Sequence, residues 1–215
     1  MNTPIHPHSA SSSAPLVVIV DDEPAVREAL DSLFRSVGLR TQLFASPAEL
    51  LEAKVPDTPG CLILDVRLPG ISGLDLQEQL ARHGIALPIV FMTGHGDIPM
   101  SVRAMKAGAV DFLPKPFRDQ DMLDAVAGAI ERDTRRRADD AALDGVRARY
   151  ATLTPREREV MAHVASGLMN KQVAGLLELS EITVKIHRGN VMRKMGVRTL
   201  ADLVRQAESL GLARR

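Results

Sequence analysis

Several apolar runs in the first half of the chain end abruptly on polar or charged side chains. The central run, Cys61–Asp65, ends on a carboxylate, and a Pro69-Gly70 turn follows it. The residues that end or follow three other runs are Asp21, Asp22, Thr93 and Lys115. Such runs are typical of strands buried on both faces of a parallel sheet. Because parallel strands end along one edge, where open α/β folds place their ligands, we expect these side chains to lie close together.

This set of side chains predicts phosphoryl chemistry. Three carboxylates within a few Å of one another repel unless a cation lies among them. Hard oxygen ligands suit Mg²⁺ (or Mn²⁺), which keeps part of its water shell and can accept a phosphoryl oxygen. With Asp21 and Asp22 as ligands, Asp65 can act as the nucleophile toward phosphorus. Lys115 and the Thr93 hydroxyl can then meet the other phosphoryl oxygens.

The elements that would position these side chains alternate regularly along the chain. Strands are predicted at 16–20, 40–44, 61–65, 88–93 and 110–113. A helical pattern follows each strand, with starts at Pro24, Ser46, Ser72, Asp97 and Asp119. This alternation predicts an α/β fold with a doubly wound, five-stranded parallel sheet.

The last of these helical patterns extends beyond the predicted sheet. It contains no proline before Pro155, and its apolar residues become sparse after Glu131. We therefore predict one long helix with a solvated second half and a weak point at Gly145; a flexible linker beyond about residue 137 is the alternative. The predicted domains are a disordered tail (1–14), an α/β domain (15–130), a helical linker (131–150) and an all-α domain (151–215).

The all-α domain contains four short helical patterns. The sequence Thr154-Pro155-Arg-Glu157 is typical of a capping box at the start of the first. The second covers 170–177, and Ser180 caps the third, which runs to Met195 and is rich in basic residues. Two helices joined by a tight turn, the second of them basic, form a helix-turn-helix pattern.

The third helix carries the candidate nucleic-acid contacts. Its apolar residues are expected to face the core: Ile182, Ile186, Val191 and Met195. The remaining residues are Thr183, Lys185, His187, Arg188, Asn190, Arg193 and Lys194. They can supply phosphate contacts and base-edge donors in the major groove of DNA, although a basic and merely solvated helix would have a similar composition.

The charge distribution fits two such sites. Formal net charge is zero overall, but residues 151–215 carry eleven Lys or Arg against six Asp or Glu, a net charge of +5, which leaves −5 on residues 1–150. A polyanion-binding module would give this asymmetry, and so could a merely solvated surface.

The single cysteine, Cys61, excludes an internal disulfide and suits a reducing compartment. No run approaches the roughly 18 apolar residues of a membrane helix, so we expect a cytoplasmic protein with no membrane role.

Residues 15–130 resemble the receiver domain of response regulators. The resemblance lies in Asp21-Asp-Glu-Pro24, Leu64-Asp-Val-Arg-Leu-Pro-Gly70, Met92-Thr-Gly-His-Gly96 and Phe112-Leu-Pro-Lys-Pro-Phe117. It implies that a sensor histidine kinase phosphorylates Asp65. It also implies that Asp21, Asp22 and Asp65 bind Mg²⁺ together with the carbonyl of the Val66–Arg67 peptide.

The same resemblance implies further roles around the pocket. Thr93 and Phe112 would form the switch pair, and Lys115–Pro116 would be a cis peptide. Arg67 and His95, each two positions beyond a pocket residue, would tune loss of the phosphoryl group. Gly94 would leave room for that group.

The C-terminal segment closely resembles the LuxR-type DNA-binding domain, through 153–160, 170–174, 183–188 and Lys194-Met195. Together the two resemblances describe a FixJ/NarL-type regulator. They imply that Lys185, Ile186 and the position of Gly189 face bases. The residues implied to contact the DNA backbone or bases are Thr183, His187, Arg188, Asn190 and Lys194. Gly189 departs from the family pattern, because it has no side chain at a position that faces bases. Two explanations stay open: the helix approaches the DNA closely there, or it reads no base at that position. Residues 199–210 would form the dimer face.

The chain is thus expected to be a transcription factor activated by phosphorylation of Asp65, dimerising on double-stranded DNA. The receiver face expected to dimerise includes Val102, Ala104, Met105 and Lys106. No enzyme activity is expected beyond self-phosphorylation and dephosphorylation at Asp65. The alternatives are a Mg²⁺-dependent phosphohydrolase that uses Asp65 and a phosphate sink that binds no DNA.

Overall fold

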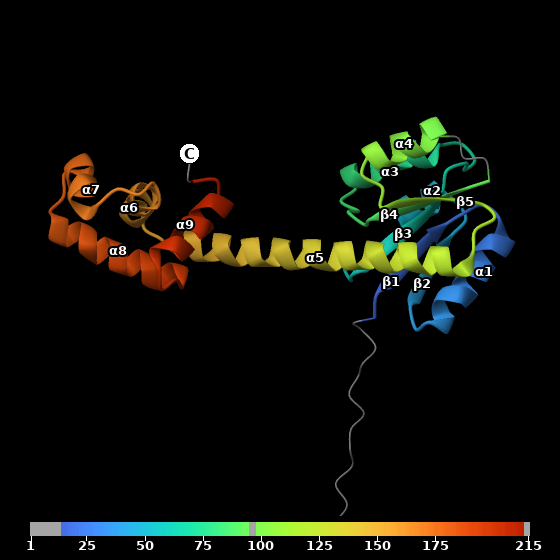
Figure 1. The fold of residues 1–215 in the computed structure, drawn as a ribbon, viewed down its shortest axis with the longest axis horizontal. Coiled ribbons are helices and arrows are strands. Elements are labelled where there is room, and N and C mark those ends of the chain that lie inside the picture. Colours follow the sequence, from blue (N-terminus) through green and yellow to red (C-terminus); the bar gives the residue numbers. More distant parts are fainter. Residues whose placement is uncertain (1–13, 95–97, 213–215) are drawn as a thin grey trace, which may run out of the picture. The chain divides into compact units, whose positions relative to one another are not determined.

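The computed structural model of the chain describes residues 14–94 and 98–212, without the side chains of Leu74, Glu78, Ala81 and Ile98. The predicted disordered tail before residue 14, the helix cap at Asp97 and the role of His95 lie outside the described residues. The chain forms two compact units, Met1–Arg137 and Ala138–Arg215. In the described parts, strands occur in the first unit, and the second unit is helical (Figure 1).

Within the described residues, the first unit is built on a five-stranded sheet whose strands are all parallel. The strands are β1 (Leu16–Val20), β2 (Arg40–Phe44), β3 (Gly60–Asp65), β4 (Ile89–Thr93) and β5 (Asp111–Pro114), in the order β2-β1-β3-β4-β5. This is the predicted doubly wound fold, and each predicted strand boundary differs from the observed one by at most one residue. The strand order reverses between β1 and β3, so a topological switch point lies at their carboxyl ends.

Helices cover both faces of this sheet (Figure 1). On one face lie α1 (Pro24–Ser36) and the first part of α5 (Asp119–Ala151); on the other lie α2 (Pro47–Glu52), α3 (Gly73–Arg82) and α4 (Ile98–Lys106). The cause is the two-residue period of a strand, because successive side chains point to opposite faces. In β3, Cys61 and Ile63 pack with α1 and α5, whereas Leu62 and Leu64 pack with α2, α3 and α4. The central strand is therefore held from both sides.

Helix α5 runs without a break from Asp119 to Ala151. Met122, Val126 and Ala129 are buried against the sheet at helical spacing. The first compact unit extends to Arg137, whereas the sequence pattern places the domain boundary at residue 130. Among the described residues, no helix combines the length and apolar character needed to cross a membrane.

The second unit contains α6 (Pro155–Ala165), α7 (Asn170–Leu177), α8 (Glu181–Met195) and α9 (Leu200–Ser209). The predicted caps form: Thr154 and Glu157 make the reciprocal bonds of a capping box, and Ser180 accepts a hydrogen bond from the N–H of Thr183. Buried side chains from these helices form one core, which Val146 and Leu153 join. The local signals at the helix starts therefore agree with the observed elements.

The apolar pattern of α8 predicts that Ile182 and Ile186 face the core, and this prediction is wrong, because their side chains are 74% and 60% exposed. The base contact that the resemblance implies for Ile186 stays a prediction. Val184 fills the core with Val191 and Met195, and all three are fully buried. These three residues are spaced by seven and four positions and so share one helix face, opposite to the two isoleucines. Ile182 and Ile186 therefore belong to the outer face of α8.

The turn between α7 and α8 contains a strained residue. Glu178 has a left-handed backbone, with φ +54° and ψ +44°. A side chain there costs roughly 1 kcal/mol relative to glycine, so we expect Glu178→Gly to stabilise the second unit by about 0.5–1 kcal/mol. Tyr150, the single tyrosine of the chain, packs against this core, so its fluorescence during urea unfolding reports on the second unit.

Gly196 provides the matched control for this measurement. It follows α8 with φ +69°, and Gly196→Ala should destabilise the same unit by about 1 kcal/mol. A lower or unchanged free energy of unfolding for Glu178→Gly, together with the expected loss for Gly196→Ala, would contradict strain at Glu178.

Candidate functional site

The ends of β1 and β3 and the segment after β5 bring two carboxylates and one ammonium group together. The Lys115 Nζ lies 2.7 Å from Asp21 Oδ2 and 2.7 Å from Asp65 Oδ2. Asp21 is fully buried, and Asp65 is only 5% exposed. These residues are distant in sequence, and they meet because parallel strands end along one edge. The structure thus places three of the predicted pocket residues in direct contact.

Burial and charge act against each other in this pocket. Burial raises the pKa of the Asp21 carboxyl, and hydrogen bonds from Lys115 and from the Glu23 N–H offset only part of that effect. Burial by itself would lower the pKa of the Lys115 ammonium, but its hydrogen bonds to Asp21 and Asp65 outweigh burial and raise that pKa. Lys115 is therefore cationic at neutral pH and offsets the charge of the carboxylates.

Asp22 adds a carboxylate from the exposed side of the pocket. Ligand oxygens of Asp21, Asp22 and Asp65 all lie within 4.8 Å of one another. The Glu23 carboxylate is 3.9 Å from the Lys115 ammonium. Three hard oxygen donors at this separation, one of them open to water, fit a divalent cation that keeps part of its hydration shell. The resemblance to the receiver domain implies such a cation at this pocket.

Main-chain groups hold Asp65 in place, and a glycine makes this possible. The Arg67 N–H donates to Asp65 Oδ1 at 2.8 Å, and the Gly73 N–H donates to the Val66 carbonyl at 2.9 Å. A Cβ on Gly73 would lie 2.5 Å from the Asp65 carbonyl oxygen, so glycine is required there. Sequence reasoning missed Gly73, because its position reads only as a helix start. The Val66 carbonyl, implied as a metal ligand, already accepts this hydrogen bond.

The remaining predicted pocket residues lie on the neighbouring strands. Thr93 ends β4 and is fully buried, and its carbonyl accepts a hydrogen bond from the Lys115 N–H at 2.7 Å. Phe112 in β5 is half-buried, with its ring centroid 6.4 Å from that of Phe91. The Lys115–Pro116 peptide is cis, as the resemblance implies. The predicted switch pair therefore lies on β4, which pairs with the strand that carries Asp65, and on β5, which pairs with β4.

In the second unit, α7, the turn at Glu178 and α8 form the helix-turn-helix. The outer face of α8 exposes Lys185, Ile186 and Gly189, and Ile182 lies on the same face one turn before Ile186. An added Cβ on Gly189 would meet no described atom within 4 Å, so the described part of the protein does not require glycine there. The other predicted contacts on this helix, Thr183, His187 and Asn190, are half-buried.

Two of the predicted DNA-contacting cations also bind groups inside the unit. Arg188 NH1 donates to Asn170 Oδ1 at 3.1 Å and connects α8 to the start of α7. Lys194 donates to Glu157 Oε2 at 2.7 Å and to the Thr152 carbonyl at 3.2 Å. Both cations help to position α8, and their contacts with DNA stay a prediction.

Comparison with known proteins gives the same two parts. Residues 17–127 match the response regulator receiver domain, and residues 151–207 match the luxR family of bacterial regulatory proteins. The chain is 56% identical to nodulation protein W of Bradyrhizobium diazoefficiens, covering 96% of this chain and 91% of that protein. It is 44% identical to the transcriptional regulatory protein FixJ of Azorhizobium caulinodans, covering 92% of this chain and 93% of that protein.

Solved structures extend the comparison over nearly the same length. The response regulator StyR aligns with a TM-score of 0.79 at 48% identity, covering 91% of this chain and 99% of that chain. Full-length FixJ from B. japonicum aligns with a TM-score of 0.56 at 37% identity, covering 94% of this chain and 100% of that chain.

A receiver domain followed by a helix-turn-helix is the organisation of a response regulator that controls transcription. The chain belongs to the LuxR/FixJ family of two-component response regulators. Its two domains imply a kinase and DNA as partners.

Glu157 makes the stability of the second unit depend on pH. Its side chain is 5% exposed, and burial alone would raise its pKa. Hydrogen bonds from Lys194 and from the Thr154 N–H outweigh burial and hold that pKa below its ordinary value of 4.5. The stabilisation is therefore complete well above pH 4.5 and is lost as the pH falls through the lowered pKa. Sequence reasoning found the capping role of Glu157 but missed the pair with Lys194.

We expect Glu157→Gln to lower the free energy of unfolding of the second unit by roughly 1–2 kcal/mol at neutral pH. The difference from wild type should shrink toward zero in acid, because wild-type Glu157 is then protonated too. Urea unfolding followed by Tyr150 fluorescence over a pH series measures it. The control is Glu159→Gln, which alters an exposed pair with Arg156 and should change little. A difference that stays constant with pH would contradict a role for the Glu157 charge.

Proposed function

We propose that this regulator is switched by a phosphoryl group that a sensor histidine kinase transfers to Asp65. The observation that carries the proposal is the Lys115 ammonium, which lies 2.7 Å from carboxylate oxygens of both Asp21 and Asp65. It puts a fixed cation beside a nearly buried carboxylate, where negative charge on transferred phosphoryl oxygens would need compensation.

We assign the role of nucleophile to Oδ2 of Asp65. Oδ1 accepts its hydrogen bond from the main-chain N–H of Arg67, whereas Oδ2 contacts the flexible Lys115 side chain, which can turn to the phosphoryl oxygens. This oxygen forms a bond to phosphorus while the P–N bond to the kinase histidine breaks, and the imidazole leaves with the bonding electron pair. Lys115 stays protonated and turns from the carboxylates to the phosphoryl oxygens.

Mg²⁺ (or Mn²⁺) is the cation that Asp21, Asp22 and Asp65 would hold. When bound, it supplies positive charge to the phosphoryl oxygens as they develop negative charge. The orientation of the site comes from the protein itself. Asp21 is buried, and its Oδ1 accepts a hydrogen bond from the Glu23 N–H at 2.9 Å, whereas the exposed Asp22 faces the solvent.

An apolar groove beside the pocket suits the kinase. Its volume is about 370 Å³, and Lys115 and Asp119 border it. The apolar residues that line it come from α1 and from the segment after β5: Ala25, Val26, Ala29, Leu30, Leu33, Pro116 and Phe117. Such a groove fits the apolar face of an amphipathic helix that presents a phosphohistidine to Asp65.

After phosphorylation, a phosphoryl group with roughly two negative charges replaces the single charge of the Asp65 carboxylate at the end of β3. Thr93 moves toward them, and the half-buried Phe112 packs more deeply against the core beside Phe91. The neighbouring helix α4 exposes Val102 (44%) and Met105 (47%), which a second receiver can cover. The expectation that Ala104 belongs to this face is wrong, because its side chain is fully buried in the core. Homodimers formed through this face then place two DNA-binding domains on one duplex, with α9 as a further dimer contact.

The outer face of α8 reads the DNA. Ile182 and Ile186 are bulky, apolar and largely exposed, and Lys185 lies between them on this face. In the major groove, aliphatic side chains contact the methyl group of thymine, and lysine donates to guanine O6 and N7. The smallness of Gly189 allows the helix to approach the bases closely. Asp65 thus controls a reader of DNA in the cytoplasm and performs no turnover on a separate substrate.

Incubation with Mg²⁺ and acetyl phosphate should place one phosphoryl group on the full-length protein, which phosphate-affinity electrophoresis and intact mass detect. Asp65→Asn should take up none, because the nucleophilic oxygen is lost. Asp75→Asn, an exposed carboxylate on α3, should be modified like wild type. Modification of Asp65→Asn would contradict the assignment, and rapid multiple turnover of acetyl phosphate by wild type would favour a phosphohydrolase.

Selection from a random duplex library should yield a half-site with thymines opposite α8. Replacement of these thymines by uracil removes only the methyl groups, and it should weaken wild-type binding roughly fourfold for each methyl group, in line with about 0.8 kcal/mol per buried group. Fluorescence anisotropy of the phosphorylated protein measures the affinity.

Matched variants separate methyl readout from general DNA affinity. An Ile182→Ala, Ile186→Ala double variant should bind the thymine and uracil duplexes alike. Lys185→Ala should bind both more weakly and keep the preference for thymine. Equal affinity of wild type for the two duplexes would contradict methyl readout by these isoleucines.

A further inference from the structure

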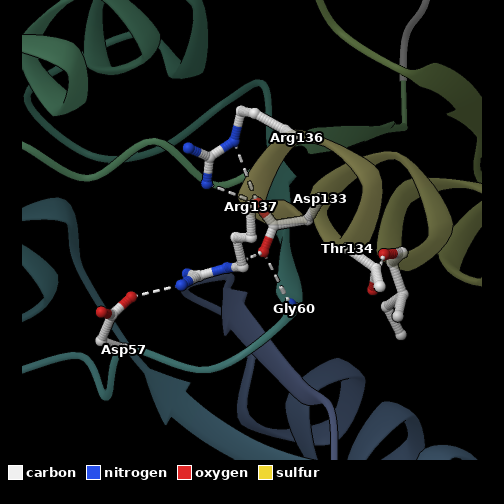
Figure 2. A network of polar contacts seen from close by, with 7 residues as sticks. Asp57, Gly60, Asp133, Thr134, Arg136 and Arg137 are labelled. Carbon is white, nitrogen blue, oxygen red and sulfur yellow. Dashed lines mark hydrogen bonds and ion pairs between the residues drawn. The ribbon is translucent and has the colours of Figure 1, made fainter. Parts of the chain in front are cut away.

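Asp133 is a fully buried charge at the amino end of β3, opposite to the Asp65 end. Its carboxylate accepts hydrogen bonds from α5 itself and from the first residue of the strand (Figure 2). Oδ1 accepts from Arg136 NH2 at 2.6 Å; Oδ2 accepts from Arg137 Nε at 2.7 Å and from the Gly60 N–H at 3.1 Å. Arg137 also pairs with Asp57, in the loop before β3. We call this set of five residues the α5 clasp.

The clasp occupies a place where an apolar residue would serve packing equally well. Asp133 continues the buried stripe of Met122, Val126 and Ala129 along α5. Buried ion pairs often add no more stability than well-packed apolar residues of similar size. What a carboxylate adds is direction, because a main-chain N–H binds it in only a narrow range of orientations. Arg136 and Arg137 lie on α5 itself, so the rotation and axial position of α5 on the sheet are fixed by the bond from the Gly60 N–H to Asp133 and by the pair of Arg137 with Asp57.

The attachment point on β3 is itself closely packed. A Cβ on Gly60 would lie 2.2 Å from the Leu16 carbonyl oxygen, and the Leu16 N–H donates to the Pro59 carbonyl at 2.9 Å. The next residue, Cys61, is fully buried, and burial followed by the nearby Asp133 charge raises the pKa of its thiol to about 12. Thus α5 is tied to a strand start that has no free space in which to shift.

Two further facts give this anchor a role in signalling. The clasp binds Gly60, the first residue of β3, and Asp65 is the last residue of the same strand. At a rise of 3.3 Å per residue, Gly60 and Asp65 lie about 16 Å apart. The first compact unit ends at Arg137, the last residue of the clasp, and α5 continues beyond it as helix to Ala151. The clasp therefore lies where the first compact unit ends, on the helix that leads to the DNA-binding domain.

We propose that Asp133 is a positioning residue that fixes α5 to β3, so that phosphorylation of Asp65 changes the DNA affinity of the second unit. This inference rests on the proposed function. Without the clasp, Asp65 still accepts the phosphoryl group, but the helix after residue 133 no longer follows the receiver.

The test uses full-length wild type, Asp133→Asn and the control Asp139→Asn, which changes an exposed carboxylate of the same helix. Phosphate-affinity electrophoresis after acetyl phosphate treatment measures modification of Asp65. Hydrogen exchange followed by mass spectrometry measures opening of residues 131–140. Fluorescence anisotropy on the selected duplex gives the ratio of DNA affinities with and without the phosphoryl group.

We expect Asp133→Asn to be phosphorylated within about twofold of wild type and to exchange at least about tenfold faster in residues 131–140. Its unphosphorylated DNA affinity should match wild type, while the affinity ratio should fall at least about threefold. A purely structural role would leave that ratio unchanged, and an unchanged ratio with faster exchange overturns the proposal.

Two further outcomes are decided by the same experiment. If Asp133→Asn does not fold, Arg137→Gln takes its place. This change removes the pairs of Arg137 with Asp57 and with Asp133 but leaves Arg136 on Asp133, and it must lower the ratio or the proposal fails. A wild-type affinity that does not respond to phosphorylation refutes the proposed function, and the positioning role with it. A responsive wild type with an equally responsive Asp133→Asn refutes the positioning role alone.

Discussion

The receiver pocket depends on one ammonium group that holds two carboxylates of like charge together. Asp21 has no access to water, and a buried charge without a partner would cost several kcal/mol. Lys115 meets this need only because β1, β3 and β5 end along one edge of the sheet, so that distant segments of the chain converge. The alignment of the parallel strands is thus a condition for the chemistry, and the apolar packing on both faces of β3 maintains it.

The same chain compensates its buried carboxylates in different ways according to what each must do. Asp133 is bound by two guanidinium groups, whose rigid forks suit a contact that should not change. Asp65 and Asp21 share a lysine, a compact point charge on a flexible stem that can turn to new oxygens. Glu157 in the second unit also pairs with a lysine, yet a main-chain N–H at its own helix start fixes it as well. A rigid guanidinium pair therefore suits a permanent contact, whereas a lysine pair occurs both at the exchangeable site and at a structural one.

Much of the fold could be predicted because its signals are local. Uninterrupted apolar runs locate the strands, and Ser46, Thr154 and Ser180 mark helix starts through their own hydrogen bonds to the backbone. The pocket was predictable too, since polarity at the end of a buried strand needs no knowledge of the rest of the chain. The placement of Ile182 and Ile186 failed because a basic helix with apolar residues on two faces does not reveal which face is buried.

Other features had no local signal at all. The need for glycine at Gly73 arises from the approach of α3 to the end of β3, and the role of Asp133 arises from a hydrogen bond across 73 residues of sequence. Such contacts exist only after the chain has folded. They also explain why the first compact unit extends to Arg137, since the apolar pattern of α5 fades before the polar contacts do.

The buried thiol beside the clasp has a practical consequence. Cys61 is the chain's single cysteine, it has no exposure, and its thiol stays protonated at any physiological pH. Oxidants and maleimide dyes react with thiolates that they can reach, so the native fold shields this sulfur from both. The regulator is therefore indifferent to redox stress at this position, and a cysteine introduced on its surface can carry a spectroscopic label without competition from the natural one.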